Sequence, residues 1–163
     1  SVEFSRKSFG NSYALPRPLV TPRELSPILQ KLVEKTGSRL RKSGYTTQGV
    51  HLSLVYRDNT WWHHGKTLPN PIFTSQDIYK NAFGILMGAP VTKPVRELAV
   101  SCFNLKAKNF MQQDLFGETE KKLNLTQAQD KINQKWGSFT LTPARMLGTQ
   151  NLIPDRIAFG GVE

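Results

Sequence analysis

Two stretches of the chain alternate between apolar and polar residues with the period of two that is typical of a strand with one buried face. The first spans residues 49–57 and the second spans residues 95–105. We expect their apolar side chains to face a core and the residues between them to form a polar surface. The apolar members are Val50, Leu52, Leu54 and Tyr56 in the first stretch and Leu98, Val100 and Cys102 in the second.

Two other stretches carry apolar residues at three- and four-residue spacing, which predicts amphipathic helices. Thr21-Pro22-Arg23-Glu24 combines a capping box with proline at the first helical position, and Gly44 is a plausible end of this helix. Thr74 is expected to cap the second helix, which ends near Gly88. The expected apolar stripes are Leu25, Ile28, Leu29, Leu32 and Val33 in the first helix and Ile78, Ala82, Ile85 and Leu86 in the second.

The remaining segments of the first two thirds complete a sheet. Asp58-Asn59 predicts a turn, residues 60–67 return as the second strand of a hairpin, and residues 5–10 form a further strand or its approach. The order strand, helix, hairpin, helix, strand predicts an α+β fold, with both helices on one face of a four-stranded sheet. The other face is expected to be open and basic, with Lys7, His51, Ser53, Arg57, Lys66 and Thr67 on it.

The C-terminal third predicts an extension of different character. Thr126-Gln127-Ala128-Gln129 has the pattern of a capping box, and Leu125, Ala128, Ile132 and Trp136 form one stripe of a helix that ends at Gly137. Such a short helix is expected to dock on another surface. Phe139, Leu141 and Met146 are expected to form a short strand beside it. Whether the extension folds back on the sheet or binds a partner is left open by the sequence.

Composition narrows the choice of partner. The chain has 163 residues, a formal net charge of +10 at pH 7 and an isoelectric point near 10.0, so it attracts polyanions, of which nucleic acid is the usual one. The alternative is that the lysines serve solubility alone. Cys102 is the only cysteine, which excludes a disulfide framework and a cysteine metal site and favours a reducing, cytoplasmic location. We expect no membrane span and no signal segment.

Two segments resemble catalytic or metal sites but lack the rest of the pattern. His63 and His64 are adjacent on an expected strand, where neighbouring side chains point to opposite faces and cannot readily share one metal ion. Gly65-Lys66-Thr67 resembles the end of a phosphate-binding loop, but the earlier glycine is missing and no helix follows. Lys66 and Thr67 are instead expected to meet a backbone phosphate. We expect no catalytic residue, metal or cofactor in this chain.

A glutamine, a short spacer and an apolar pair follow the last expected strand, in Gln112-Gln113-Asp114-Leu115-Phe116. Leu115 and Phe116 lie among polar residues, where burial inside the chain is least expected. Such a pair either staples the segment onto its own domain or inserts into a pocket of another protein. The pattern alone leaves both possibilities open.

Several of these segments together resemble the C-terminal little finger domain of Y-family translesion DNA polymerases. The resemblance covers residues 1 to about 116, and Val95-Arg96-x-Leu98-Ala99-Val100-x-x-x-x-Leu105 is its most specific part, although Glu97 and the two hairpin tryptophans depart from the family pattern. It implies a little-finger domain over 1–108, a clamp-binding loop over 109–118 and a C-terminal extension over 119–163. The residues expected to contact DNA are Arg6, Lys7, Ser8, His51, Ser53, Arg57, Lys66, Thr67 and Arg96.

The resemblance also implies partners. Residues 112–116 are similar to the peptide with which such polymerases bind the bacterial sliding clamp, through Gln112, Asp114, Leu115 and Phe116. Residues 128–133 and 136–137 resemble the polymerase V catalytic subunit type more than the polymerase IV type. The implied function is a non-catalytic module of an error-prone polymerase in the SOS response, which binds the primer-template duplex, the clamp and the remaining polymerase domains. The parent polymerase would use Mg²⁺.

Two other functions compete with this interpretation. An RNA-binding α+β module would present paired, exposed aromatic side chains on which splayed bases stack. The expected strands lack such pairs, although Trp61 or Trp62 could serve. A small hydrolase based on His63 or His64 lacks any partner residues at a useful spacing.

Overall fold

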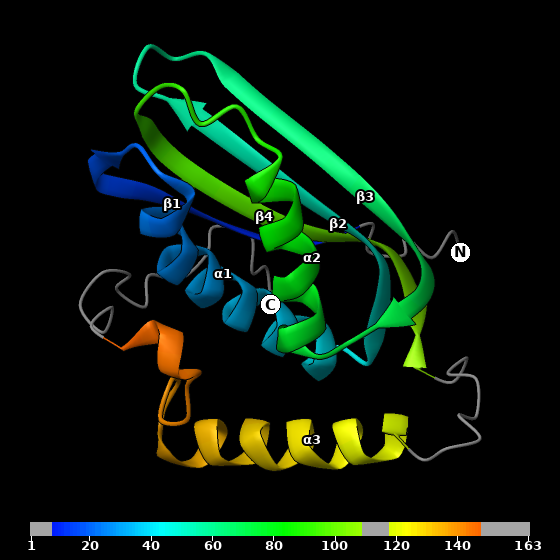
Figure 1. The fold of residues 1–163 in the computed structure, drawn as a ribbon. Helices are drawn as coiled ribbons and strands as arrows, with labels where there is room; N and C mark the ends of the chain where they lie inside the picture. The colour runs from blue at the N-terminus through cyan, green and yellow to red at the C-terminus, as the bar shows by residue number, and fades with distance from the viewer. Residues whose placement is uncertain (1–7, 109–117, 148–163) are drawn as a thin grey trace, which may run out of the picture.

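A computed structural model of the chain describes residues 8–108 and 118–147. Four strands and two helices make up the first of these ranges, and a third helix with a short 3-10 turn makes up the second (Figure 1). In chain order the elements are β1 (Ser8–Leu19), α1 (Pro22–Lys42), β2 (Tyr45–Tyr56), β3 (Trp61–Ile72), α2 (Ser75–Met87), β4 (Val95–Ala107), α3 (Glu118–Trp136) and the 3-10 turn Ala144–Met146.

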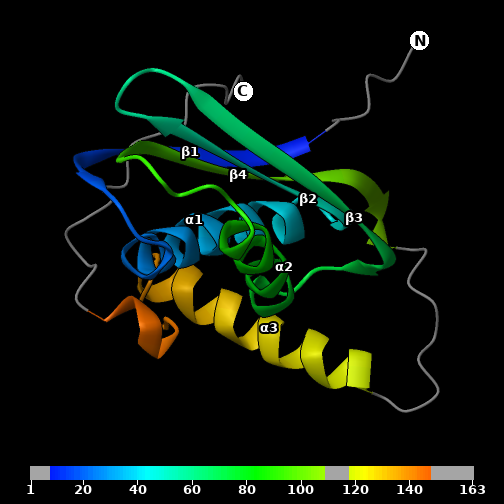
Figure 2. The same cartoon turned by 45° about the horizontal axis from the view of Figure 1, so that its top comes forward.

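The strands form one antiparallel sheet in the order β1-β4-β2-β3, so that β1 and β3 are its edges. Helices α1 and α2 lie side by side against one face, and α3 lies beyond them as a third layer (Figure 2). Within the described ranges no helix covers the other face. The α+β fold class with an open sheet is therefore confirmed.

The core fills the space between the sheet and the first two helices. Every residue of the two apolar stripes predicted for the helices is buried there, together with the apolar members of the two alternating strands. The Cys102 thiol lies in this core, where burial raises its pKa to about 12. The predicted register of β2 and β4 is thus confirmed, with Val50, Leu52 and Leu54 facing the helices.

The helix ends follow the predicted capping. The Thr21 hydroxyl accepts from the Glu24 amide at 3.2 Å, and the Glu24 carboxylate accepts from the Thr21 amide at 3.1 Å. Thr74 caps α2 by accepting from the amide of Asp77 at 3.0 Å. Each cap satisfies amides that the first helical turn leaves without a partner, so these caps fix where the chain turns from strand or loop to helix.

The third helix differs from its prediction. It begins at Glu118, so Thr126 is a buried residue within the helix and not its cap. The stripe expected to dock points to solvent instead, with Leu125 and Trp136 72% and 68% exposed. The capping prediction failed because a threonine followed three residues later by glutamine also occurs inside helices, and Glu118 and Glu120 give the first turn a favourable charge.

A polar face attaches α3 to the rest of the protein. The guanidinium of Arg41, near the end of α1, donates two hydrogen bonds to the Asp130 carboxylate at 2.7 and 2.8 Å. It also donates to the Phe73 carbonyl and the Ser75 hydroxyl, both at 3.1 Å. Arg41 therefore joins α1, the start of α2 and α3, and the described part of the extension folds back on the helices, not on the sheet.

The chain after α3 forms no strand in its described part, contrary to the strand expected from Phe139, Leu141 and Met146. The Asn133 side chain exchanges two hydrogen bonds with the backbone of Leu141, at 2.8 and 3.2 Å, which turns the chain back on the helix. Met146 is then buried in a 3-10 turn, and the neighbouring Arg145 stacks over the Tyr79 ring at 4.5 Å. Met146 is therefore buried against the helices while Leu141 remains exposed, so the apolar residues of this segment do not line up on one face as those of a strand would.

Replacing Asp130 with alanine is expected to release α3 from the other two helices. The Arg41 and Asp130 side chains are only 12% and 19% exposed, so loss of the carboxylate removes two charge-assisted hydrogen bonds from a mostly buried guanidinium, at a cost of about 1–3 kcal/mol. Amide hydrogen exchange should accelerate in α3 and remain unchanged in the strands. Asn124→Ala, at an exposed position of the same helix, is the control. Equal exchange in α3 of the wild type and Asp130→Ala would contradict this docking.

Candidate nucleic-acid interface

The uncovered side of the sheet is a surface of four residue rows, which we call the open face. Paired residues of neighbouring antiparallel strands project to the same side, so the register assigns each position. Counted from β1 to β3, the rows are Ala14-Glu97-Val55-Trp61, Ser12-Ala99-Ser53-His63, Gly10-Ser101-His51-Gly65 and Ser8-Phe103-Gly49-Thr67.

The centre of the open face is small and nearly uncharged. Its middle rows carry mostly serine, glycine and alanine, and Glu97 is the one acidic or basic residue in the four rows apart from histidine. Burial lowers the pKa of His51 below the ordinary value of histidine, and the neighbouring His63 and His64 lower it further. This shift favours the neutral form of His51. The face therefore offers mainly uncharged hydrogen-bonding groups, and its small side chains allow a ligand to approach the backbone closely.

Two of the basic side chains predicted to contact DNA, those of Arg57 and Arg96, lie at the end of the sheet where β2 ends and β4 begins. Arg57 directly follows β2 and is exposed, and its amide donates to the Pro94 carbonyl at 2.8 Å. Arg96 is also exposed and has no register partner in β2, since Tyr56 pairs with Val95 and Val55 pairs with Glu97. Such irregularities are typical of β-bulges at the ends of strands. Arg57 and Arg96 are thus two exposed basic residues at this end of the sheet, which we call the basic rim.

A neighbouring ion pair fixes the turn beside this rim. The Lys93 ammonium donates to the Asp58 carboxylate at 2.6 Å, and this bond, with further bonds from Thr60, holds the pKa of Asp58 at about 2. Asn59 adopts the left-handed conformation at φ 65°, which asparagine tolerates in turns. The predicted turn at Asp58-Asn59 is confirmed. Arg57 lies just before this turn and Trp61 just after it.

The structure places the predicted DNA contacts unevenly. Ser8, His51, Ser53 and Thr67 lie on the open face. Lys66 does not, because it pairs with Val50, whose side chain is in the core. Its placement on the open face was wrong for a physical reason: adjacent strand residues point to opposite faces, so Lys66 and Thr67 cannot share one. Arg6 and Lys7 lie outside the described residues, as do Gln112, Asp114, Leu115 and Phe116 of the expected clamp-binding segment.

The two adjacent histidines of β3 separate as expected. His63 lies on the open face, where its Nδ1 is 3.0 Å from Nε2 of His51, whereas His64 lies on the helix side, stacked beside Trp62. Over residues 8–108 and 118–147 no group of three or more histidine, cysteine, aspartate or glutamate side chains is placed to hold a metal ion.

Sequence reasoning named Trp61 as a possible stacking residue but missed the row of rings to which it belongs on the open face. Trp61 stacks on His63 with ring centroids 5.0 Å apart, and His63 contacts His51 with centroids 5.1 Å apart. Phe103 of β4 lies over Gly49, where an added Cβ would come within 2.4 Å of its ring. The His51 and Phe103 rings both border Gly65, which pairs with His51 in the register. The sequence signal for this row was the spacing of Trp61 and His63, because residues two apart on a strand project from the same face.

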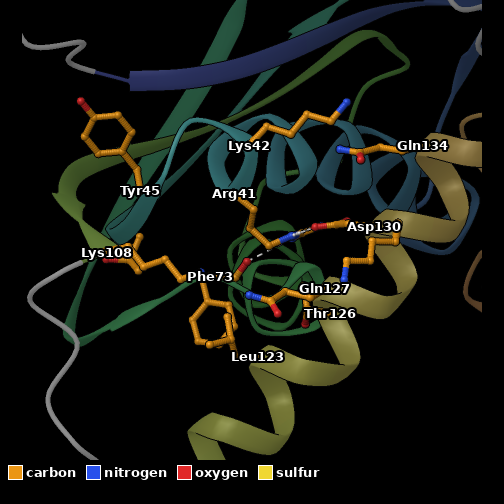
Figure 3. A pocket seen from close by; sticks show the side chains of 12 residues that line it. Arg41, Lys42, Tyr45, Phe73, Lys108, Leu123, Thr126, Gln127, Asp130 and Gln134 are labelled. Atoms are coloured by element: carbon orange, nitrogen blue, oxygen red, sulfur yellow. Dashed lines mark hydrogen bonds and ion pairs between the residues drawn. The ribbon is translucent and has the colours of Figure 1, made fainter.

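A pocket of about 370 Å³ lies on the opposite side of the protein, between the end of α1, the start of β2 and α3 (Figure 3). Arg41 and Asp130 form its polar floor, and Phe73 and Leu123 contribute apolar surface. Lys42, Lys108 and Lys131 at its border favour an anionic group. The lining contains no paired nucleophile and base, so its chemistry is that of binding and not of a reaction.

None of the helices in the described ranges combines the length with the apolar composition that crossing a membrane requires.

Comparison with known sequences shows the family. The model of the impB/mucB/samB family C-terminal domain matches residues 6–115. The chain is 32% identical over 148 residues to the DNA polymerase IV of Pelotomaculum thermopropionicum, covering 86% of this chain and 37% of that protein. It is 33% identical over 132 residues to the DNA polymerase IV of Moorella thermoacetica, covering 80% of this chain and 33% of the relative. The chain thus spans about a third of the length of these relatives.

Solved structures show the same fold. A Y-family DNA polymerase chimera superposes with a TM-score of 0.54 at 21% identity, over 63% of this chain and 30% of the chimera. DinB from Sulfolobus solfataricus gives a TM-score of 0.53 at 20% identity, over 60% of this chain and 28% of that protein. With the open four-stranded sheet, the helix pair behind it and the match over residues 6–115, the chain belongs to the impB/mucB/samB C-terminal domain family, the little finger domain of Y-family polymerases.

Proposed function

We propose that this chain is the non-catalytic DNA-binding and clamp-binding module of an error-prone translesion DNA polymerase. The observation that carries the proposal is the open face with its basic rim, on a chain of net charge +10. Its small central side chains permit close approach of a duplex, and the exposed guanidinium groups of Arg57 and Arg96 suit phosphate oxygens. Ser8, His51, Ser53 and Thr67 supply hydrogen-bonding groups to the same duplex.

Arg6, Lys7 and Lys66 remain predicted DNA contacts on charge alone. Lys66 belongs to the helix side of an edge strand, and its long exposed stem is suited to reach around that edge toward a phosphate. Clamp binding through Gln112, Asp114, Leu115 and Phe116 rests on the sequence of that segment and on its place directly after β4. We propose 1–108, 109–118 and 119–163 as the corresponding units.

The proposed parent is longer than this chain, since the matched segments make up only 37% and 33% of the relatives named DNA polymerase IV. The parent's catalytic carboxylates and Mg²⁺ would belong to domains outside this sequence. The parent would synthesise DNA past lesions in the cytoplasm during the SOS response. The narrower resemblance to the polymerase V type rests on residues 128–133 and 136–137 alone and remains a prediction. The matched relatives carry the name polymerase IV.

Duplex binding is expected to be electrostatic and nearly independent of sequence. Each phosphate that the protein neutralises should add about −0.9 to the slope of log K against log salt, so that Arg57→Ala with Arg96→Ala should make the slope shallower by about 1.8. The double variant should lose affinity equally on two unrelated duplexes. Fluorescence anisotropy titrations at several salt concentrations measure both quantities.

A matched pair of substitutions separates a specific face from diffuse attraction. Lys80→Ala with Lys121→Ala removes the same two charges from exposed positions on α2 and α3, away from the open face. This control should change the slope little. Equal losses in the two double variants would mean that DNA binds by net charge alone, and affinity independent of salt would refute the proposal. Stronger competition by single-stranded RNA than by the duplex would favour the RNA-binding alternative.

A further inference from the structure

The row of rings on the open face suits a second mode of nucleic-acid contact, distinct from the phosphate binding proposed for the rim. We propose that Trp61, His63 and His51 form a stacking platform for the unpaired bases of a single DNA strand. This inference rests on the proposed function and deepens it, because it names which part of a DNA substrate meets this region of the open face.

The geometry of the platform suits a flat ligand. The Trp61 and His63 rings are inclined by only 26° with centroids 5.0 Å apart, and His51 extends the row onto the neighbouring strand. The 3.0 Å bond between His51 and His63 fixes the orientation of both imidazoles. The His51 ring and the Phe103 ring both lie over Gly65, 3.4 and 3.6 Å from where a Cβ would be, so Phe103 borders the row at this end. The rings are thus held in place before a ligand arrives.

The exposure of Trp61 distinguishes this row from ordinary packing within a sheet. Cross-strand aromatic pairs stabilise sheets by burying ring surface against a neighbour. Trp61 keeps 68% of its surface in solvent even though one side meets His63, so most of its apolar area contributes nothing to the described fold. A large ring left in this state on a nucleic-acid-binding face is suited to stack with a base.

The charges around the platform specify the ligand further. Arg57 lies across the hairpin turn from Trp61, where its exposed guanidinium suits a phosphate adjoining the stacked base. A base within a duplex has both of its faces covered by its neighbours, so only an unpaired base presents a face to Trp61. Stacking of this kind tolerates any base. The ligand is therefore single-stranded DNA, such as the unpaired strand beside a primer-template junction.

The test compares three probes with the 163-residue chain: an oligothymidine strand, an abasic strand with the same number of phosphates, and a duplex. The wild type is expected to bind oligothymidine about tenfold more tightly than the abasic strand, with quenching of tryptophan fluorescence. Trp61→Ala should remove this preference and the quenching while binding to the abasic strand is unchanged. Trp61→Phe should retain part of the preference, because it keeps a ring.

Trp136→Ala is the matched control, because Trp136 is also 68% exposed but lies on α3, away from the sheet. It should leave every affinity unchanged, and a thermal melt of Trp61→Ala should coincide with that of the wild type. Equal binding of oligothymidine by the wild type and Trp61→Ala would overturn the inference, and so would an equal loss on all three probes. If the protein binds the duplex but does not prefer oligothymidine over the abasic strand, the stacking inference is wrong while the proposed function stands. No binding to any probe would overturn the proposed function as well.

Discussion

Replacing Leu52 with alanine is expected to lower the free energy of unfolding by about 2–5 kcal/mol, through lost burial and the cavity that remains. Leu52 is fully buried in the middle of β2, paired with Val100 of β4 and facing α1 and α2. Ser53→Ala, one position further on, should change the stability by no more than about 0.5 kcal/mol, because Ser53 lies on the open face. Urea melts of both variants against the wild type measure the difference.

This adjacent pair is a test of register as much as of packing. A slip of one residue in β2 would exchange the two faces of the strand, so Ser53 would enter the core and His51 would turn toward the helices. The order of the two stability losses would then reverse. A larger loss for Ser53→Ala than for Leu52→Ala would therefore remove both the proposed DNA contacts on β2 and the stacking platform that includes His51.

The elements that were predicted correctly are those in which local chemistry and tertiary packing agree. Thr21 and Thr74 cap helices in any tertiary setting, because their hydroxyl groups satisfy amides within three residues of them. The apolar period of β2 matches the face that the helices cover. For these segments the sequence pattern and the final packing depend on the same residues, so the pattern was sufficient.

The third strand was harder to orient because its sequence has no clear period. Residues 61–66 place two tryptophans, two histidines, a glycine and a lysine in succession, so neither face is marked as apolar. The strand order makes β3 an edge, and one side of it has no neighbour to constrain the residues. Only the pairing of Lys66 with Val50 shows that Lys66 belongs to the helix side, and only the pairing of Trp61 with Val55 reveals the platform.

For the third helix, the sequence pattern predicted the helix but not the face by which it docks. Its apolar stripe was strong enough to predict a helix but gave the wrong docking face, because Arg41 and Asp130 decide the attachment from positions 89 residues apart in the sequence. A bidentate pair of this kind has strict geometry and leaves no periodic trace in the sequence. The stripe with Leu125 and Trp136 consequently remains in solvent in the described structure.

The largest effect on partner binding is expected from Leu115→Ala combined with Phe116→Ala. If both side chains enter an apolar pocket of the sliding clamp, their loss removes about 1.5–3 kcal/mol each, enough to weaken binding more than about 100-fold. Gln112→Ala should have a smaller effect, since it removes hydrogen bonds at the border of that contact. These residues lie outside the described structure, so the prediction rests on their sequence pattern. Titration of the chain against the clamp by isothermal calorimetry measures it.

Leu125→Ala with Leu147→Ala provides the matched control, because both leucines are more than 70% exposed and lie outside the clamp-binding segment. This variant loses similar apolar surface and should bind the clamp as the wild type does. If Leu115 and Phe116 instead pack against their own domain, the first double variant should have a lower melting temperature, and its folded fraction should still bind the clamp. If Leu115 and Phe116 insert into a pocket of the clamp, the first double variant should lose binding while its melting temperature is unchanged. An unchanged titration would show that other residues bind the clamp.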